Sequence, residues 1–345
     1  MSCRIRVMRP FVALALAASG WMAVSNPSAQ SRLPARLDAY LTKTVQLTAE
    51  ERASLMSGEP VAKPLQADPQ REVAVFGAIW IDAPVARYIA ALDDIENFEK
   101  GGGFRATKKV SEPARLDDFA ELVLPPEDIE DLRACEVGSC EIKLGAEALA
   151  RLRKEVDWSR TDAKAQVEQV ARAIAVEYVT AYRAGGNSRL AVYRDSEKPT
   201  YVAEEFRRLI EAMPELTEYV PDMRRYLLEF PKTSSRPTRS FIYWQEAEFG
   251  LKPTIRINHV AIQESPTATV VASKQLYSSH YFWTALELRV LVPDPSRGKG
   301  FWFVNVNRSR SDGLSGFVGR IIRGKVREGA RSGMEAALRA TKGAL

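Results

Sequence analysis

The pattern of hydrophobic and polar positions divides the chain into a mixed segment, a helical segment and a strand-rich segment. In the stretch 72–82, EVAVFGAIWID, apolar residues occupy both alternating sets of positions, which predicts a strand covered on both faces. Pro84 follows at a helix-start position, and apolar residues then recur at helical intervals as far as Phe98, which predicts two short helices. The GGG at 101–103 ends them, and FRATKKVS predicts a second strand at 104–110.

From about 113 to 238 the periodicity is helical. Apolar residues stand three and four positions apart in successive stretches that are separated by Pro, Gly and Asp. The tyrosines of this segment suggest a surface for a sugar or aromatic ligand, although at helical spacing core packing with the hydroxyl at the rim is the commoner arrangement. These residues are Tyr178, Tyr182, Tyr193, Tyr201, Tyr219 and Tyr226.

Strand-type alternation returns after residue 239. Five runs with hairpin-type connections predict an antiparallel meander. The stretch from Gly316 onward predicts one long helix, with an apolar stripe on one side and most of its basic residues on the other. The stripe consists of Phe317, Ile321, Ile322, Val326, Met334, Ala337 and Leu338.

The beginning of the chain is expected to lie outside this fold. Three arginines precede a short apolar stretch, and small residues follow at 23–25 and 27–29. This is typical of a secretory signal peptide over residues 1–25, with cleavage as late as residue 29. The apolar stretch is shorter than the roughly 20 residues of a transmembrane helix, which disfavours an uncleaved anchor. The mature protein is therefore predicted to be periplasmic or secreted.

Residues 26–69 are predicted to be an N-terminal linker that contains one short helix. The helix is expected near 48–57, because Thr48 and Glu51 have the spacing of a capping box.

Charge excludes one class of partner and suggests another. The formal net charge of +5 falls to +2 when the signal and its three arginines are removed, so the mature chain has no nucleic-acid signature. The segment from Phe301 onward is the basic part, with nine basic and three acidic residues. Arg320, Arg323 and Arg327 on the outer face of the last helix suggest peripheral contact with an anionic membrane, and a solvated charged face is the alternative.

Two cysteines of the mature chain stand close together. Cys135 and Cys140 in CEVGSC predict a small-loop disulfide, in keeping with an oxidising compartment. A redox-active pair is the alternative, but four residues intervene where thioredoxin-like motifs have two. No histidine lies nearby, so a metal site is not expected, and the chain carries no nucleotide-binding or catalytic metal motif that would call for a cofactor.

The predicted order of strand, two helices, six strands and helix resembles the START-like superfamily. This is the helix-grip fold of lipid-transfer domains, polyketide cyclases and coenzyme Q-binding proteins. The segment IWIDAPVARYIAALDDIENF is similar to its first strand and helices, and the helix after GFWFVNVNR is similar to its gripping helix. The resemblance covers 70–112 and 239–345 and leaves 113–238 as a helical insertion. The expected fold class is therefore α+β, an antiparallel sheet gripped by the long C-terminal helix.

The resemblance implies a cavity between the sheet and the last helix that receives an apolar molecule. Gly324 and Gly329 recur in that helix, where glycines either leave space or let the helix approach the sheet closely. Trp302 on the preceding strand is expected to pack nearby. The candidate ligand-binding residues are His259, His280, Trp302, Gly324 and Gly329.

The two histidines of the chain are the candidates for polar chemistry in such a cavity. Strand alternation places His259 on a face with Ile257, and His280 on a face with Phe282, so both are expected to point to the apolar side. Each is then either a hydrogen-bonded core residue or a proton donor, general acid or general base.

Three functions follow as hypotheses. The first is an exported carrier or binding protein for an apolar, lipid-like ligand held between the sheet and the C-terminal helix. The second is a structural or partner-binding protein of the cell envelope. The third is an enzyme of the cyclase or hydrolase kind that uses the cavity histidines.

Overall fold

The computed structural model of the chain describes residues 33–101, 103–249, 252–314 and 316–345. The predicted signal peptide lies outside these residues. Among the helices of the described part, none is both long enough and apolar enough to cross a membrane.

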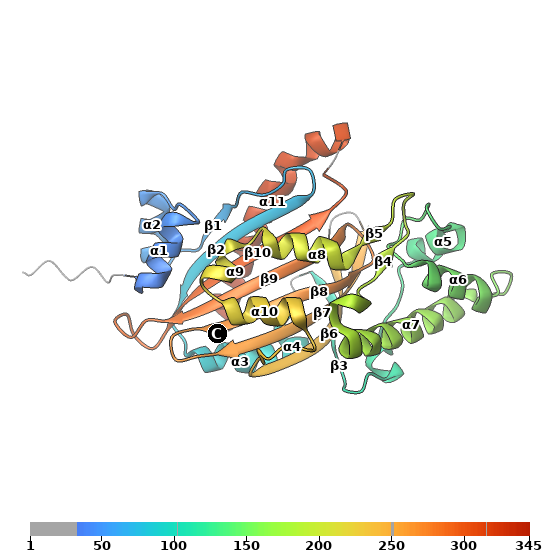
Figure 1. The fold of residues 1–345 in the computed structure, drawn as a ribbon, viewed down its shortest axis with the longest axis horizontal. Helices are drawn as coiled ribbons and strands as arrows, with labels where there is room; N and C mark the ends of the chain where they lie inside the picture. The colour runs from blue at the N-terminus through green and yellow to red at the C-terminus, as the bar shows by residue number, and fades with distance from the viewer. Residues whose placement is uncertain (1–32, 102, 250–251, 315) are drawn as a thin grey trace, which may run out of the picture. The chain divides into compact units, whose positions relative to one another are not determined.

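An antiparallel sheet forms the centre of the described residues and has eight strands there (Figure 1). Their order is β1-β2-β10-β9-β8-β7-β6-β3, so the predicted meander of the last five strands is confirmed, and so is the α+β class. The strands are β1 (Val61–Pro64), β2 (Glu72–Ile81), β3 (Phe104–Val110), β6 (Arg239–Phe249), β7 (Lys252–Glu264), β8 (Thr269–Ser278), β9 (Phe282–Pro293) and β10 (Phe301–Ser311).

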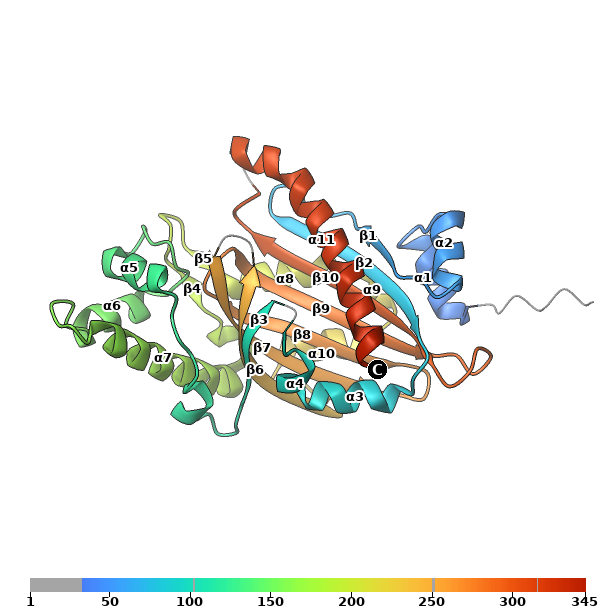
Figure 2. The same ribbon diagram turned by 180° about the vertical axis from the view of Figure 1, so that it is seen from behind.

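One face of the sheet, here called the grip face, carries α11 and the two short helices that follow β2 (Figure 2). Met334 and Leu338 in the C-terminal half of α11 pack on β2. Gly77 of β2 permits this approach, because a Cβ at that position would lie 2.5 Å from Cγ of Met334. A C-terminal helix packed on an antiparallel sheet is compatible with a helix-grip-like fold. The three helices are α3 (Val85–Asp93), α4 (Ile95–Phe98) and α11 (Gly316–Ala344).

The opposite face, here called the insertion face, is covered largely by the segment between β3 and β6. The chain leaves the sheet after Val110 and returns at Arg239, although Val110 and Ile242 are paired on neighbouring strands. Each helical stretch predicted between them forms a helix, and the structure adds one short α-helix at Pro214–Glu218. These are α5 (Pro126–Ala134), α6 (Ala146–Glu155), α7 (Ala163–Gly185), α8 (Val202–Glu211), α9 (Pro214–Glu218) and α10 (Pro221–Glu229), with the short strands β4 (Val192–Tyr193) and β5 (Thr200–Tyr201).

The segment before β2 holds more secondary structure than the predicted linker with one helix. The expected helix is α2 (Ala49–Met56), and its capping box is present, with Thr48 and Glu51 each bonding the other's backbone N–H. The structure adds the edge strand β1 and a further helix, α1 (Ala35–Lys43). α1 buries Leu37 and Leu41 against the insertion face, and this short apolar pattern is the signal that the linker prediction overlooked.

Cys135 and Cys140 form the predicted disulfide at the end of α5, with their Cα atoms 4.5 Å apart. Gly138 makes the turn between them with φ of +94°, a conformation that favours glycine. Its N–H donates to the carbonyl of Arg194 at 2.7 Å. The disulfide loop is thereby tied to the chain just after β4.

Candidate ligand-binding site

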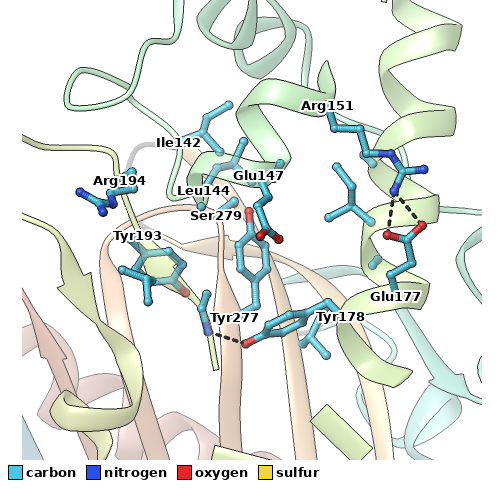
Figure 3. Close-up of a pocket in the computed structure, with 18 of the residues that line it drawn as sticks. Ile142, Leu144, Glu147, Arg151, Glu177, Tyr178, Tyr193, Arg194, Tyr277 and Ser279 are labelled. Atoms are coloured by element: carbon cyan, nitrogen blue, oxygen red, sulfur yellow. Dashed lines mark hydrogen bonds and ion pairs between the residues drawn. The ribbon is translucent and has the colours of Figure 1, made fainter. Parts of the chain in front are cut away.

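A pocket of about 840 Å³ lies between the insertion face of the sheet and helices α5, α6 and α7 (Figure 3). Ile255 and Ile257 of β7 and Tyr277 of β8 form its side toward the sheet. The volume lies within the range of about 300–1,000 Å³ typical of small-molecule sites. Most of its other walls are apolar. They include Leu122, Leu124, Leu132, Ile142, Leu144, Leu152, Leu190 and Val192.

Small residues on α7 account for much of this space. Ala171, Ala175 and Ala181 line the pocket together with Ile174 and Tyr178, at the three- and four-residue intervals that place side chains on one helix face. A core-facing helix usually carries larger side chains at such positions. Here the methyl groups keep α7 near the sheet without filling the volume between them.

Four tyrosines line the pocket, of which Tyr201 is largely exposed, and the hydroxyls of the other three differ in what they bind. The Tyr178 hydroxyl donates to the Leu276 carbonyl at 2.7 Å and accepts from the Ala191 N–H at 3.3 Å. The Tyr193 hydroxyl accepts from the Ser278 N–H at 3.2 Å. For the Tyr277 hydroxyl, no hydrogen bond to another described residue is found. Burial raises the pKa of all three phenols, which keeps them protonated.

A β-bulge sets the orientation of Tyr277. On β8, Gln275 is paired with Asn258 and Tyr277 with Ile257, so Leu276 is the extra residue. Simple alternation would turn Tyr277 to the face opposite Leu276, whereas the bulge places both on the insertion face. Alternation along β8 therefore gives no signal that Tyr277 lines a site.

Charged side chains stand at the edge of the pocket. Arg151 of α6 donates to both carboxylate oxygens of Glu177 on α7, at 2.7 and 2.8 Å (Figure 3). Glu147, Arg189 and Arg194 also contribute to the lining. The site therefore combines an apolar interior with a charged rim.

His280 touches this site through a buried carboxylate. The sequence placed it on a strand, but it lies in the turn between β8 and β9. Its Nε2 is 3.0 and 3.1 Å from the two oxygens of Asp128 on α5, and both residues are buried. Asp128 in turn lines the pocket. The pair fixes α5 to the end of the sheet.

His259 occupies a different place on the insertion face, as its alternation with Ile257 predicted. Its Nδ1 lies 2.9 Å from the hydroxyl of Tyr182 on α7, and its Nε2 lies 3.2 Å from the hydroxyl of Tyr226 on α10. Burial, with Lys274 and Arg183 nearby, lowers the pKa of His259 to about 3. The imidazole is therefore neutral at ordinary pH and joins two insertion helices to β7.

Lys274 completes the His259 network. It is buried, donates to Asn187 and approaches the Tyr182 hydroxyl at 3.4 Å. Its Nζ also lies 4.2 Å from the centre of the Phe206 ring. Burial lowers the pKa of Lys274 to about 7. Beside this network lies a second, polar pocket of about 400 Å³, which His259 and Arg183 help to line.

The other predicted site residues do not join the histidines in one cavity. Trp302 is buried on the insertion face, where its indole N–H donates to Asp294 at 3.0 Å and its ring packs on Trp80. Gly324 and Gly329 are exposed on α11, over the grip face, and no atom of a described residue lies within 4 Å of a Cβ built on either. The expected grouping of the five candidates is therefore not formed.

The stripe and basic face predicted for the last helix are described only in part. Met334 and Leu338 are buried as expected, but Val326 and Ala337 are exposed. The side chains of Phe317, Arg320, Ile321 and Ile322 lie outside the described residues.

Comparison of the chain with known proteins gives no match to any protein-family model and no match to a curated protein sequence.

Proposed function

We propose that the protein is an exported binding or carrier protein for an amphipathic, largely apolar ligand, held in the pocket under α5, α6 and α7. The supporting observation is a pocket of about 840 Å³ with apolar walls and one inward hydroxyl without a bond to the described residues. Burying apolar ligand surface there supplies affinity in proportion to the area removed from water. The START-like resemblance also favours a carrier.

The proposed ligand site lies on the insertion face, whereas the START-like resemblance implied a site between the sheet and α11. The resemblance implies that Gly324 and Gly329 face such a site, but a Cβ built on either glycine meets no atom of a neighbouring element, among the described residues, within 4 Å. The pocket on the insertion face has both volume and lining, so it is the better candidate. Helices α5, α6 and α7 of the segment between β3 and β6 then form the walls of the site opposite the sheet.

Tyr277 would orient the ligand. Its protonated hydroxyl suits a carbonyl or hydroxyl oxygen, whereas Tyr178 and Tyr193 already bond the backbone. The charged rim with Arg151 and Glu177 would hold a polar end of the ligand near solvent. Such an arrangement selects amphipathic molecules over plain hydrocarbons.

The experiment is a fluorescence titration of the mature protein with a naturally fluorescent fatty acid. Ala175→Phe, which fills the space beside α7, is expected to weaken binding more than tenfold. Ala184→Phe, on an exposed position of the same helix, serves as the matched control and should bind like the unmodified protein. Tyr277→Phe should weaken binding about fivefold, the worth of one hydrogen bond.

Circular dichroism of each variant shows that the fold is kept. Equal binding by Ala175→Phe and Ala184→Phe would contradict the proposed location. If the unmodified protein binds no apolar probe and organic extraction releases nothing, the carrier function is wrong and the partner-binding hypothesis becomes the better one.

Export is the second part of the proposal. The predicted signal and the disulfide between Cys135 and Cys140 support it. The mature chain is expected to begin near Asn26 or Gln30 and to have both cysteines blocked against thiol labelling before reduction. An intact Met1 in a cytosolic fraction would contradict export.

Contact with an anionic membrane through α11 remains part of the proposal. Figure 2 shows the first turns of α11 extending past the sheet. Arg327 and Lys325 of α11 are exposed, whereas Arg323 donates to the Pro69 carbonyl. Co-sedimentation with anionic and neutral vesicles tests this, and Arg327→Glu should weaken binding only to the anionic ones.

A further inference from the structure

A buried polar cluster lies on the grip face, in the middle of the same sheet. Its residues come from neighbouring strands and face the same side, because Gln245 is paired with Arg256, Asn258 with Gln275, and Asn305 with Arg289. Glu99, just after α4, approaches it from above the sheet. We call these residues the polar cluster: Glu99, Thr107, Gln245, Arg256, Asn258, Gln275, Glu287, Arg289 and Asn305.

Part of the polar cluster is internally satisfied. The side-chain oxygen of Gln245 accepts from Arg256 and from Asn258, both at 3.1 Å, and its amide nitrogen donates to Glu99 at 3.3 Å. On the other side, Glu287 is paired with Arg289 and accepts from the Asn305 amide at 2.7 Å. The cluster is thus an organised set of groups.

The remaining polar atoms of the cluster have no partner. Among the described residues, both amide atoms of Gln275 are buried without a hydrogen bond, as are Oδ1 of Asn305, Nε of Arg256 and Oγ1 of Thr107. Buried polar atoms in native proteins are nearly always bonded, because an unmet bond costs free energy. A face that served only to hold α11 would be apolar here, as it is at Ile79 and Val260.

Solvent reaches the centre of the cluster. The Glu287 side chain keeps 23% of its exposure and that of Arg289 keeps 11%, although β9 lies inside the sheet. A small molecule that arrived beside this ion pair would meet the unbonded amide of Gln275 and the unbonded amide oxygen of Asn305 on the flanking strands. Gln275 offers a donor and an acceptor, and Asn305 offers an acceptor.

Charge decides which kind of molecule fits. Two guanidinium groups, Arg256 and Arg289, face two carboxyl groups, Glu99 and Glu287. Burial raises the pKa of Glu99 to about 7, against the opposing effect of both arginines. Burial also disfavours ionisation of Glu287, but Arg289 beside it lowers its pKa overall. Below pH 7 the cluster therefore carries one excess positive charge.

We propose that the polar cluster is a second binding site, for a small hydrophilic monoanion such as a sugar acid or another hydroxy acid. The carboxylate of the ligand would accept from the guanidinium donors, and its hydroxyls would bond the amide of Gln275 and the amide oxygen of Asn305. This site lies on the face of the sheet opposite the apolar pocket. The proposal is therefore independent of the carrier function.

The first experiment compares two glutamines of the cluster by thermal unfolding. Gln275→Leu removes two unmet polar atoms, so it should raise the melting temperature, by about 2 °C. Gln245→Leu breaks three hydrogen bonds and should lower it. If both substitutions lower the melting temperature alike, Gln275 serves the fold and the proposal is wrong.

The second experiment adds D-gluconate and D-glucuronate, with D-glucose as the neutral control. The two acids should raise the melting temperature of the unmodified protein, glucose should do so less, and Gln275→Leu should abolish the shift. Fatty-acid binding by Gln275→Leu should stay normal, which separates failure of this site from failure of the apolar pocket. Absence of any shift with these acids and with D-glycerate overturns the proposal.

The third experiment uses pH, because Glu99 is faced by Arg289 and Glu287 of β9, Arg256 of β7, Tyr243 of β6 and Tyr88 of α3. As Glu99 ionises, the excess positive charge is cancelled, so affinity for gluconate should fall roughly tenfold for each pH unit above 7. Glu99→Gln cannot ionise and should bind gluconate equally at pH 6 and pH 8. If the affinity of Glu99→Gln for gluconate falls with pH as much as that of the unmodified protein, the proposed role of Glu99 in the site is wrong.

Discussion

The two faces of the sheet use alternate residues of the same strands for different purposes. On β7, Ile255 and Ile257 line the apolar pocket, while Arg256 and Asn258 belong to the polar cluster on the other side. Under the insertion, the main ionic and hydrogen-bonding groups are paired with groups of the insertion helices. On the grip face, five buried side-chain atoms of the polar cluster have no partner among the described residues, and on the insertion face Nε of Arg308, Oε1 of Glu215 and the Tyr40 hydroxyl also lack one.

The two sets of polar groups therefore contribute differently to the stability of the fold. Groups that bond across two elements, such as His280 with Asp128, attach the insertion to the sheet. A contribution to folding stability does not explain why buried polar groups without a partner are present, because apolar residues of similar shape would stabilise the fold more. Substitutions of the bonded groups and of the unbonded amides should therefore have opposite effects on stability.

The largest effect is expected where α8 meets β2 and β10. Glu72 is buried and bonds Arg308 and Arg310, and Arg310 also donates to Glu205 of α8 at 2.8 Å. Glu72→Ala should lower the free energy of unfolding by about 3–5 kcal/mol, because it leaves the buried guanidinium of Arg308 without a carboxylate partner and that of Arg310 with Glu205 alone. Urea denaturation of the two proteins measures the difference.

An exposed ion pair supplies the control for Glu72. Arg339 of α11 and Glu59 are more than half exposed and lie 3.1 Å apart. Glu59→Ala should cost about 0–1 kcal/mol, since solvent screens such pairs. Similar losses for Glu59→Ala and Glu72→Ala would mean that the buried network does not hold the insertion.

A smaller loss of stability is expected in acid, where His259 becomes protonated in the unfolded state. Its pKa is about 3 in the folded protein, against about 6.5 when unfolded, so the unfolded state binds the additional proton between these values. Stability should therefore fall as pH is lowered through this window, by about 3 kcal/mol between pH 7 and pH 4. His259→Gln, which keeps hydrogen-bonding groups, should remove this part of the acid loss. An unchanged pH profile in that variant would show that His259 is not shielded as described.

Lys274 should make the stability of the protein depend on pH above 7, whereas His259 does so below pH 7. Its pKa is about 7 when folded and about 10.4 when unfolded, so the unfolded state again holds more protons between the two values. Stability should rise by about 2 kcal/mol from pH 7 to pH 9. Lys274→Met should flatten that rise, and Lys325→Met, at an exposed position of α11, should leave it intact. A rise that persists in Lys274→Met would assign it to another group.

The elements of the fold were predictable from periodicity, and the site was not. The double apolar alternation of β2 and the meander after residue 239 give clear local signals. The pocket depends instead on where α7 meets β8 in space and on a bulge that reverses the orientation of Tyr277. Local patterns do not encode either feature. The polar cluster was hidden for a related reason, since its residues occur singly among apolar ones on separate strands.

The smallest expected effect concerns glycines, which behave differently on the sheet and on the helix. Gly324 and Gly329 are exposed in α11, and a Cβ on either meets no described residue within 4 Å. Gly324→Ala and Gly329→Ala should therefore each stabilise the protein by at most about 1 kcal/mol, because alanine favours the helix, and neither should change fatty-acid binding. Gly77→Ala on β2 is the contrasting variant, because its Cβ would fall 2.5 Å from Cγ of Met334, so the Met334 side chain or α11 must shift. Thermal unfolding separates these outcomes. If Gly329→Ala destabilises the protein or blocks fatty-acid uptake, α11 encloses a ligand space after all, and the site belongs on the grip face.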